Sequence, residues 1–429
     1  MSFDIALSGI QAINEQLTAS SNNIANAGTY GFRSSRANFS SMYAGDRATG
    51  VEIGSTTQSM SVNGGVLNTG RTLDAAIDGR GYFVSRDAQN TLSYSRVGIF
   101  SASSSGYLTD SNGKMVQGYA PAAKGSTTLG PMGDMKIPTG QIPAQATENL
   151  SYVANLSSEW TIKDGTKFDK TDIQTYNSAK VSVLYDSLGA KHTLSQYFVK
   201  TDASTVEVHY TLDDKPMMQQ PLATPAKEMV STLLFGTDGQ LAKVNGAAPN
   251  NEPVAPAVRG ADWKPTFDAV KMGDPIANSG AAALAFNLNY SDTTLYAGET
   301  TTSTNKSDGY ASGTYTGVEL ASDGSIMAKY TNGETKNVGT IALANFADEG
   351  ALTAADNTSW TASTASGAPL YERPGVGMAG KLATSSLEQS NVDITTELVG
   401  LMTSQRNYQA NSKVLSTENA MLQSLMQAL

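Results

Sequence analysis

The sequence predicts an α+β protein with β-rich middle domains of barrel or sandwich type, and with N- and C-terminal helices that pair into a coiled-coil-like assembly domain. Two observations predict this class. Near both ends, apolar residues recur at alternating spacings of four and three, which is the pattern of a coiled-coil seam. Between the ends, short alternating runs are separated by Gly, Asp and Asn, as in strands joined by turns.

Residues 1–27 are predicted to form the first helix. Seven positions follow the four-three spacing and five of them are apolar, which indicates a narrow seam rather than a broad core-facing surface. The predicted seam residues of this helix are Phe3, Leu7, Ile10, Leu17 and Ile24. Residues 28–70 are rich in Gly, Ser, Thr and Asn and carry few large apolar side chains, so we expect an extended connecting arm there.

The middle of the chain changes to short strand-like runs such as "GYFVSR" and "LSYSRVGIF". A stretch rich in Pro and Gly at 130–143 indicates a domain boundary. We expect residues 71–146 and 285–380 to form a middle β domain together. Residues 147–284 are then expected to form an outer β domain that is inserted into it.

Residues 381–429 are predicted to complete the helical assembly domain. From position 394 to 429 the four-three spacing continues, and eight of its eleven positions are apolar. The predicted seam residues are Ile394, Leu398, Leu401, Tyr408, Leu415, Leu422, Met426 and Leu429. The helices could pack on their own domain, or pair with each other and with neighbouring chains. Because a lone helical hairpin is marginally stable, we expect neighbours to complete the burial.

Charge and composition exclude several classes of function. The formal net charge is −10 and no basic stripe is present, so no nucleic-acid partner is expected. The chain has no cysteine, which excludes disulfides, thiol catalysis and Cys-ligated metals. No run approaches the roughly 18 apolar residues of a membrane span. The start, "MSFDIALSGIQ", lacks the basic region of a cleavable signal peptide.

Motifs that could carry chemistry are weak. "GVGMAGKL" (375–382) has the G-x-G-x-x-G spacing, but Leu382 stands where a phosphate-binding loop needs Ser or Thr, so we interpret it as a linker. His192 and His209 lie in alternating runs without a carboxylate cluster of metal-binding spacing, which is typical of ordinary strand histidines. No catalytic residue, cofactor-binding residue or metal ligand is predicted, and the chain is expected not to be an enzyme.

Several stretches match a known family. "NNIANAGTYGFRSS" (22–35), "AAIDGRGYFV" (75–84) and "LEQSNVDITTELVGLMTSQRNYQANSKVL" (387–415) resemble the N-terminal signature, the start of the common β domain and the C-terminal helix of the bacterial flagellar rod and hook proteins. The stretches 183–200, 309–320 and 331–346 resemble the hook branch of this family. Distal rod proteins are similar but shorter, so the insertion at 147–284 also favours the hook branch.

The resemblance implies a structural subunit without cofactors, whose copies polymerise into a tube that acts as a universal joint between motor and filament. The implied partners are further copies of the chain, the flagellar rod protein below, the hook cap and the hook–filament junction protein above, and the flagellar type III export apparatus. It also implies a place outside the cell at the flagellar hook, reached without a cleaved signal peptide. Neither nucleic-acid binding nor membrane insertion is implied.

The first matching stretch supplies the joint between the helix and the arm. Its residues within the family motif are Asn22, Asn23, Asn26, Gly31 and Phe32. Asn26 and Gly28 can end the helix, because Asn and Gly tolerate left-handed backbone. Tyr30 and Phe32 are expected to anchor the arm.

Two other interpretations stay open from the sequence. Another flagellar axial protein, of the distal rod or hook-associated type, would carry the same terminal signatures but would differ in the outer domain. A secreted β-rich adhesin would fit the many Asn, Thr and Tyr residues of the middle region. The adhesin does not account for the two terminal seams.

Overall fold

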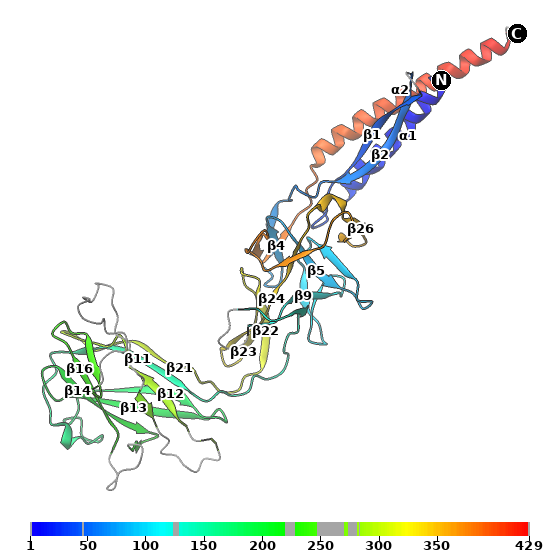
Figure 1. The fold of residues 1–429 in the computed structure, drawn as a ribbon. Helices are drawn as coiled ribbons and strands as arrows, with labels where there is room; N and C mark the ends of the chain where they lie inside the picture. Colours follow the sequence, from blue (N-terminus) through cyan, green and yellow to red (C-terminus); the bar gives the residue numbers. More distant parts are fainter. Residues whose placement is uncertain are drawn as a thin grey trace. The chain divides into compact units, whose positions relative to one another are not determined.

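The computed structural model describes residues 2–44, 47–122, 128–218, 228–246, 270–272, 281–282 and 284–427. Figure 1 shows a β-rich chain with one helix at each end, which confirms the predicted α+β class. The chain divides into two compact units. The first unit holds residues 1–139, 316–329 and 335–429, and the second holds residues 140–315 and 330–334.

The two helices of the first unit are α1 (Ser2–Ala25) and α2 (Ile394–Gln427). Asp393 starts α2, because its carboxylate accepts hydrogen bonds from the backbone N–H groups of Thr395 at 2.9 Å and Thr396 at 3.3 Å. These bonds satisfy two donors of the first turn that have no partner within the helix. Within the described residues, neither helix combines the length and the apolar character that a membrane span requires.

The predicted extended arm is a paired hairpin over most of its length. Strands β1 (Ser35–Ala44) and β2 (Arg47–Gln58) are antiparallel, and the hairpin lies along α1 (Figure 1). The backbone N–H of Val51 donates to Ser8 Oγ at 3.2 Å. A Cβ on Gly50 would collide with the same oxygen, so only glycine allows this approach. A hairpin with one face on a helix and the other exposed needs few large apolar residues, which is why composition suggested an unpaired arm.

The main sheet of the first unit is branched and has thirteen strands. Its strands are β5 (Tyr82–Arg86), β6 (Leu92–Ser95), β7 (Phe100–Ala102), β8 (Leu108–Asp110), β9 (Met115–Tyr119), β10 (Met132–Asp134), β22 (Tyr315–Leu320), β23 (Ser325–Tyr330), β24 (Thr335–Ile341), β25 (Leu343–Asn345), β26 (Thr353–Ala355), β27 (Ser359–Thr361) and β28 (Leu370–Glu372). The short helix η2 (Glu349–Ala351) follows β25. Aromatic residues dominate the core between the strands; the rings of Tyr94 and Phe346 meet edge to face with centroids 4.8 Å apart.

Two small sheets bring the ends of the chain to this β domain. Strand β3 (Val66–Asn68) pairs with β30 (Ser386–Glu388), and β4 (Ala75–Asp78) pairs with β29 (Lys381–Thr384). Residues 381–388 were predicted as part of the helical domain, but they are strands. Their partners lie more than 300 positions earlier in the chain, so no local pattern indicates the pairing.

The second unit contains two sheets. One sheet has β11 (Asn149–Ser157), β18 (Val270–Met272), β19 (Phe286–Asn289), β20 (Thr294–Tyr296) and β21 (Thr301–Ser307). The other has β12 (Ser178–Tyr185), β13 (Lys191–Lys200), β14 (Thr205–Leu212), β15 (Lys215–Pro216), β16 (Val230–Phe235) and β17 (Leu241–Val244); the short helix η1 (Gly165–Lys167) precedes it. Both sheets contribute to one apolar core, as in a sandwich.

The core of the second unit also holds a chain of buried hydrogen bonds. The hydroxyl of Tyr290 donates to Gln196 Oε1 at 2.7 Å and lies 2.9 Å from the hydroxyl of Tyr210. Gln196 Nε2 in turn donates to Ser182 Oγ at 3.0 Å. Burial raises the pKa of both tyrosines, so both stay neutral hydroxyl groups. Every polar group in this series of hydrogen bonds has a partner, which is the condition for burying such groups without a large free-energy cost.

The second unit is longer than the predicted insertion 147–284. Its boundary falls near 140 and 315, because β19 to β21 follow residue 284 and all pair with β11. Strands β19 and β20 pair with β11 in parallel, and β21 pairs with it antiparallel. Such parallel pairs over more than 130 residues leave no hairpin signal in the sequence, so these strands were assigned to the middle domain.

The two histidines lie on neighbouring strands in opposite environments. Phe168 stacks on His209 with ring centroids 4.2 Å apart, and burial lowers the pKa of His209 to about 4. His192 Nδ1 lies 2.7 Å from Asp213 Oδ2, and its Nε2 lies 3.4 Å from Asp186 Oδ2. Burial opposes the charge of His192, but hydrogen bonds to these two carboxylates and their charges outweigh burial and raise its pKa.

These histidines should make the stability of the second unit depend on pH in opposite directions. The unfolded chain binds a proton at His209 below about pH 6.5, whereas the folded chain binds it only near pH 4, so stability falls as the pH drops through this window. The contribution of His192 is complete below about pH 6.5 and is lost as the pH rises through its raised pKa. His209→Phe should therefore remove a loss of about 2 kcal/mol between about pH 7.5 and 5, measured by urea denaturation.

His192→Gln is the matched control for this experiment. It should keep the loss at acid pH, and it should lower the unfolding free energy more at about pH 5 than at about pH 8. An acid loss of the same size in His209→Phe and in the unmodified protein would contradict the assignment.

Candidate functional site: the paired helices and their junction

The two terminal helices meet at small and polar residues. A Cβ on Gly9 would lie 2.8 Å from Asn411 Nδ2, so the side chain of Asn411 packs directly against the backbone of α1 there. Asn23 Nδ2 donates to Glu397 Oε1 at 2.8 Å, which fixes the antiparallel register further along the pair. Ser404 of α2 is buried between these two contacts. Small side chains therefore set the distance between the helices.

The face of α2 that lies on α1 is rotated from the predicted seam. Its buried or half-buried residues include Glu397, Leu401, Ser404, Asn411, Leu415 and Glu418. This set shares Leu401 and Leu415 with the prediction. Its other members, Glu397, Ser404, Asn411 and Glu418, each lie one residue before a predicted four-three position (398, 405, 412 and 419). Several stripes of α2 have a four-three spacing, and the small residues of the opposite helix decide which stripe faces it.

The predicted seam residues lie on more than one face. Half-buried among them are Ile10, Leu17, Ile24, Leu401 and Leu415. Exposed are Phe3, Leu7, Ile394, Leu398, Tyr408, Leu422 and Met426, the last with 78% of its surface accessible. Leu429 lies outside the described residues. Because the second group is exposed in a single chain, its contact with neighbouring copies stays a prediction.

Asn23 is the centre of the predicted joint and is almost fully buried. Its Oδ1 accepts a hydrogen bond from the N–H of Ser35, and its Nδ2 donates to the carbonyl of Ser35, both at 2.8 Å. The same Nδ2 donates to Glu397 on α2. One side chain thus connects the end of α1, the start of β1 and the start of α2.

The other predicted joint residues shape the turn after α1. Asn26 Nδ2 donates to the carbonyl of Asn22 at 2.9 Å, which closes the last turn of the helix. Gly31 has a φ of 67°, and a Cβ there would lie 2.9 Å from a methyl group of Val97. Phe32 is half-buried. The backbone conformation and the close approach both require glycine at position 31.

Asn391 mirrors Asn23 on the other side of the joint. Its Oδ1 accepts from the N–H of Ser34 at 2.7 Å, and its Nδ2 donates to the carbonyls of Ser59 at 3.0 Å and Val62 at 2.9 Å. It precedes α2 by three residues, so it connects the start of this helix to both ends of the hairpin. The two asparagines together hold the helical pair at the β domain.

Next to the joint, the carboxylate of Glu388 lies between two buried arginines. Oε1 is 2.8 Å from Arg33 Nη2, and Oε2 is 2.7 Å from Arg96 Nε. Asn63 Oδ1 accepts from both guanidinium groups, at 3.2 Å and 3.0 Å. We call Arg33, Asn63, Arg96 and Glu388 the junction cluster. With one carboxylate for two guanidinium groups, the cluster carries a net positive charge inside the protein.

The two arginines of the junction cluster are not equivalent. Arg96 also donates to the carbonyls of Ile77 at 3.0 Å, Gly79 at 3.0 Å and Gly81 at 2.6 Å, which fixes the connection between β4 and β5. Arg33 has no hydrogen-bond partner in the described residues for its Nε and Nη1 atoms. Burial lowers the pKa of Arg33, and the charge of Glu388 opposes this shift. Arg33 is therefore the less compensated of the two charges.

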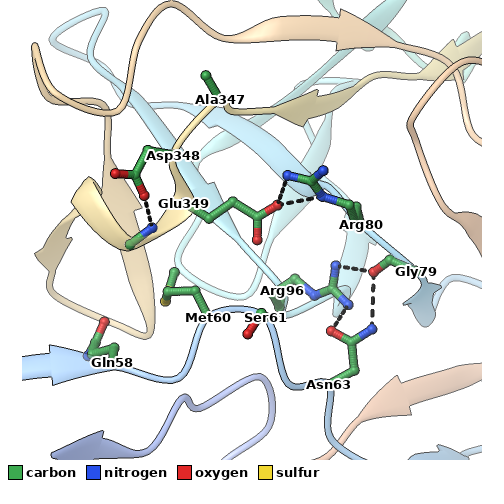
Figure 2. A pocket seen from close by; sticks show the side chains of 11 residues that line it. Gln58, Met60, Ser61, Asn63, Gly79, Arg80, Arg96, Ala347, Asp348 and Glu349 are labelled. Carbon is green, nitrogen blue, oxygen red and sulfur yellow. Dashed lines mark hydrogen bonds and ion pairs between the residues drawn. The ribbon is translucent and has the colours of Figure 1, made fainter.

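A pocket of about 440 Å³ lies beside the junction cluster. Figure 2 shows Glu349 paired with Arg80 in it, and Arg96, Asn63 and Gly79 connected by hydrogen bonds. Glu349 accepts from Arg80 Nε at 2.9 Å. Arg80 and Glu349 neutralise each other within the lining, whereas the counter-charge of Arg96 is Glu388, which lies outside it. In the part of the chain that the structure describes, no group of three or more His, Cys, Asp or Glu is placed to hold a metal ion.

Sequence reasoning missed Arg33, Arg96, Glu388 and Asn391. Arg33, Glu388 and Asn391 lie in stretches that had been matched to the family, but only the asparagines, a glycine and an aromatic residue of the first stretch were singled out. A signal existed at Arg96, which is a charged residue inside the strand-like run "YSRVGIF". A charge in such a run is buried only when it is paired, so it indicates a partner elsewhere in the chain.

Comparison with known proteins identifies the family. Models of the flagellar hook protein FlgE/F/G D1 domain, the flagellar basal body protein FlaE D2 domain and the flagellar basal body rod FlgEFG protein C-terminal region match residues 76–153, 155–310 and 383–428. The flagellar hook protein FlgE of Escherichia coli (strain K12) is 33% identical over 99% of both chains. The chain belongs to the flagellar hook protein family. FlgE of Salmonella typhimurium is 32% identical over 99% of both chains, and FlgE of Brucella suis biovar 1 is 30% identical over 98% of this chain and 96% of its own.

The predicted resemblance is confirmed, and with it the prediction that the chain is a structural protein of the flagellar hook. The match to the D2 domain covers residues 155–310, which lie within the second unit. The match to the C-terminal region covers α2 and the strand β30 that carries Glu388. The ion pair of Arg96 with Glu388 therefore joins two segments that the family models recognise separately, and Arg33 and Asn63 lie before the first of them.

Charge balance in the junction cluster gives a test of its role. Glu388→Gln leaves two buried guanidinium groups without a counter-charge and should lower the unfolding free energy of the first unit by about 3–5 kcal/mol. Arg33→Met leaves one carboxylate and one guanidinium group, so it should cost clearly less, about 1–3 kcal/mol. Urea denaturation combined with hydrogen exchange of β3 and β4 measures both variants.

The matched control is Glu349→Gln, which removes a carboxylate from a pair whose arginine is 53% exposed. It should change stability by less than about 1 kcal/mol. If Arg33→Met destabilises the protein as much as Glu388→Gln, the excess positive charge is not what distinguishes the two positions.

Proposed function

We propose that this chain is the repeating subunit of a tubular hook, a universal joint that transmits motor torque to the filament in flagellum-dependent motility. Similarity to hook proteins over 99% of the chain supports the role. The exposed apolar side chains of α2 support polymerisation, because a single chain leaves them in water. A non-enzymatic role agrees with the junction pocket, where Arg80 is paired with Glu349 and Arg96 with Glu388.

The observation that carries this proposal is the apolar surface of α2. Its exposed large side chains are Ile394, Leu398, Val399, Met402, Tyr408, Val414, Met421, Leu422 and Met426. Covering one such side chain contributes about 1.5–3 kcal/mol. These side chains lie on several sides of α2, and exposed apolar side chains in this number are typical of a protein–protein contact. The stripe of α2 that lies on α1 contains Leu401 and Leu415 beside small and polar residues, so the exposed side chains remain for neighbouring copies.

In this proposal, each part of the chain has its own role in the tube. The terminal helices, with the predicted seam residues, form the contacts that hold the tube together, and the junction cluster transmits force from them to the β domain. The two β units form the outer parts of the wall. The neighbouring proteins are the flagellar rod protein below and the hook cap and hook–filament junction protein above. The chain leaves the cell through the flagellar type III export apparatus, without a cleaved signal peptide. Its location is then extracellular, at the flagellar hook.

Polymerisation of the purified full-length chain tests the role. The unmodified protein should form tubes at high concentration, seen by negative-stain electron microscopy. Leu398→Ser combined with Met402→Ser should raise the concentration needed for tube formation at least about tenfold, because two apolar side chains lose their cover. Both residues are exposed in the single chain, so circular dichroism of the monomer should not change.

The matched control is Ile173→Ser, which replaces a residue of the second unit that is 67% exposed. This variant should form tubes at the same concentration as the unmodified protein. Equal polymerisation of the α2 variant and the control would argue against assembly through α2.

A further inference from the structure

The helix α2 extends beyond the helix that it pairs with. Gly9 lies opposite Asn411 and Asn23 lies opposite Glu397, so the two numbers of a facing pair add to 420. Ser2, where α1 begins, is then level with residue 418. Residues 419–427 of α2 continue past this point, and Figure 1 shows this end of α2 projecting beyond the end of α1. We call residues 419–427 the overhang.

The overhang is apolar on one side and carries no charge. Its sequence is "NAMLQSLMQ", in a chain whose formal net charge is −10. Leu422 and Met426 are four positions apart, so they lie on the same face, and both are more than half exposed. Leu422 also continues the stripe of Glu397, Leu401, Ser404, Asn411, Leu415 and Glu418 that lies on α1. The stripe of α2 that packs on α1 thus continues beyond the end of α1.

A groove of matching character lies elsewhere on the same part of the protein. It has a volume of about 340 Å³ and lies between α1, the β1–β2 hairpin and α2. Its floor and rim include Gly9, Ala12, Ile13, Phe39, Val51 and Ala410. No charged residue is among those that line it. Phe39 at the rim is 40% exposed, so the groove presents apolar surface to the outside.

We propose that the overhang of one copy binds in this groove of a second copy, with Leu422 and Met426 against Ile13, Phe39 and Val51. The contact cannot form within one chain. Met426 lies fifteen positions along α2 from Asn411, which lines the groove, and a helix covers about 22 Å in that length. An uncharged contact also suits two copies that carry the same negative charge.

The contact would give the polymer its direction. It joins two different surfaces of the same protein, and such head-to-tail contacts produce open helical assemblies rather than closed pairs. The inference rests on the proposed self-assembly of the chain and adds which surfaces meet. It continues the interface of α1 and α2 from one copy into the next.

Disulfide cross-linking tests the contact, because the chain has no cysteine of its own. Chains with Met426→Cys are mixed with chains with Val51→Cys, polymerised and mildly oxidised. A disulfide requires Cα atoms within about 7 Å, so a cross-linked dimer is expected in tubes of the mixture and in neither variant alone. Ser424→Cys is the matched control; it is exposed on the opposite side of the overhang and should give little dimer with Val51→Cys.

A second measurement does not depend on cysteine chemistry. Leu422→Ser should raise the concentration needed for tube formation roughly tenfold, and Gln423→Ser should leave it unchanged. Tubes without the cross-link, or with equal cross-linking through Ser424→Cys, would overturn this contact and leave the proposed function in place. If the unmodified chain forms no tubes, the proposed function and this contact fall together.

Discussion

The ion pairs of Glu388 with Arg33 and Arg96 are the constraint on which the junction depends. The three side chains are at most 2% exposed, so each charge has lost nearly all contact with water. The carboxylate belongs to the strand before α2, Arg33 follows α1, and Arg96 belongs to the β domain. Separating any of these segments would leave a buried charge without a partner, which costs far more than the pair itself contributes. Both ends of the chain are therefore held at one place.

The helical pair that leaves this junction has the apolar surface that the proposed polymer would cover. Asn23 and Asn391 fix its base through hydrogen bonds, and Gly9 and Ser404 fix the distance between the helices. None of these four residues covers the exposed large apolar side chains of α2. In an ordinary helical hairpin those side chains would form the interface between the two helices. Here they stay exposed in the single chain, and assembly as proposed above would bury them.

The second unit follows a different principle. Its two sheets enclose a core of their own. The hydrogen bonds from Tyr210 through Tyr290 and Gln196 to Ser182 give every polar group in this series a partner. A single copy thus completes this unit without help from neighbours. A unit with its own packed core keeps its fold when its contacts with neighbouring copies change, which suits the universal joint proposed above.

The sequence by itself determined the α+β class, the two terminal helices, the family and the importance of Asn23 and Gly31, because helix periodicity, turn residues and local motifs are all short-range features. It did not determine the pairing of β1 with β2 along α1, the strands at 381–388 or the boundary of the second unit, since these depend on partners far away in the chain. The face of α2 that packs on α1 was decided by where small residues of two distant segments meet. The junction cluster was likewise decided by tertiary structure, because a buried charge can be recognised as stable only when its partner is brought beside it.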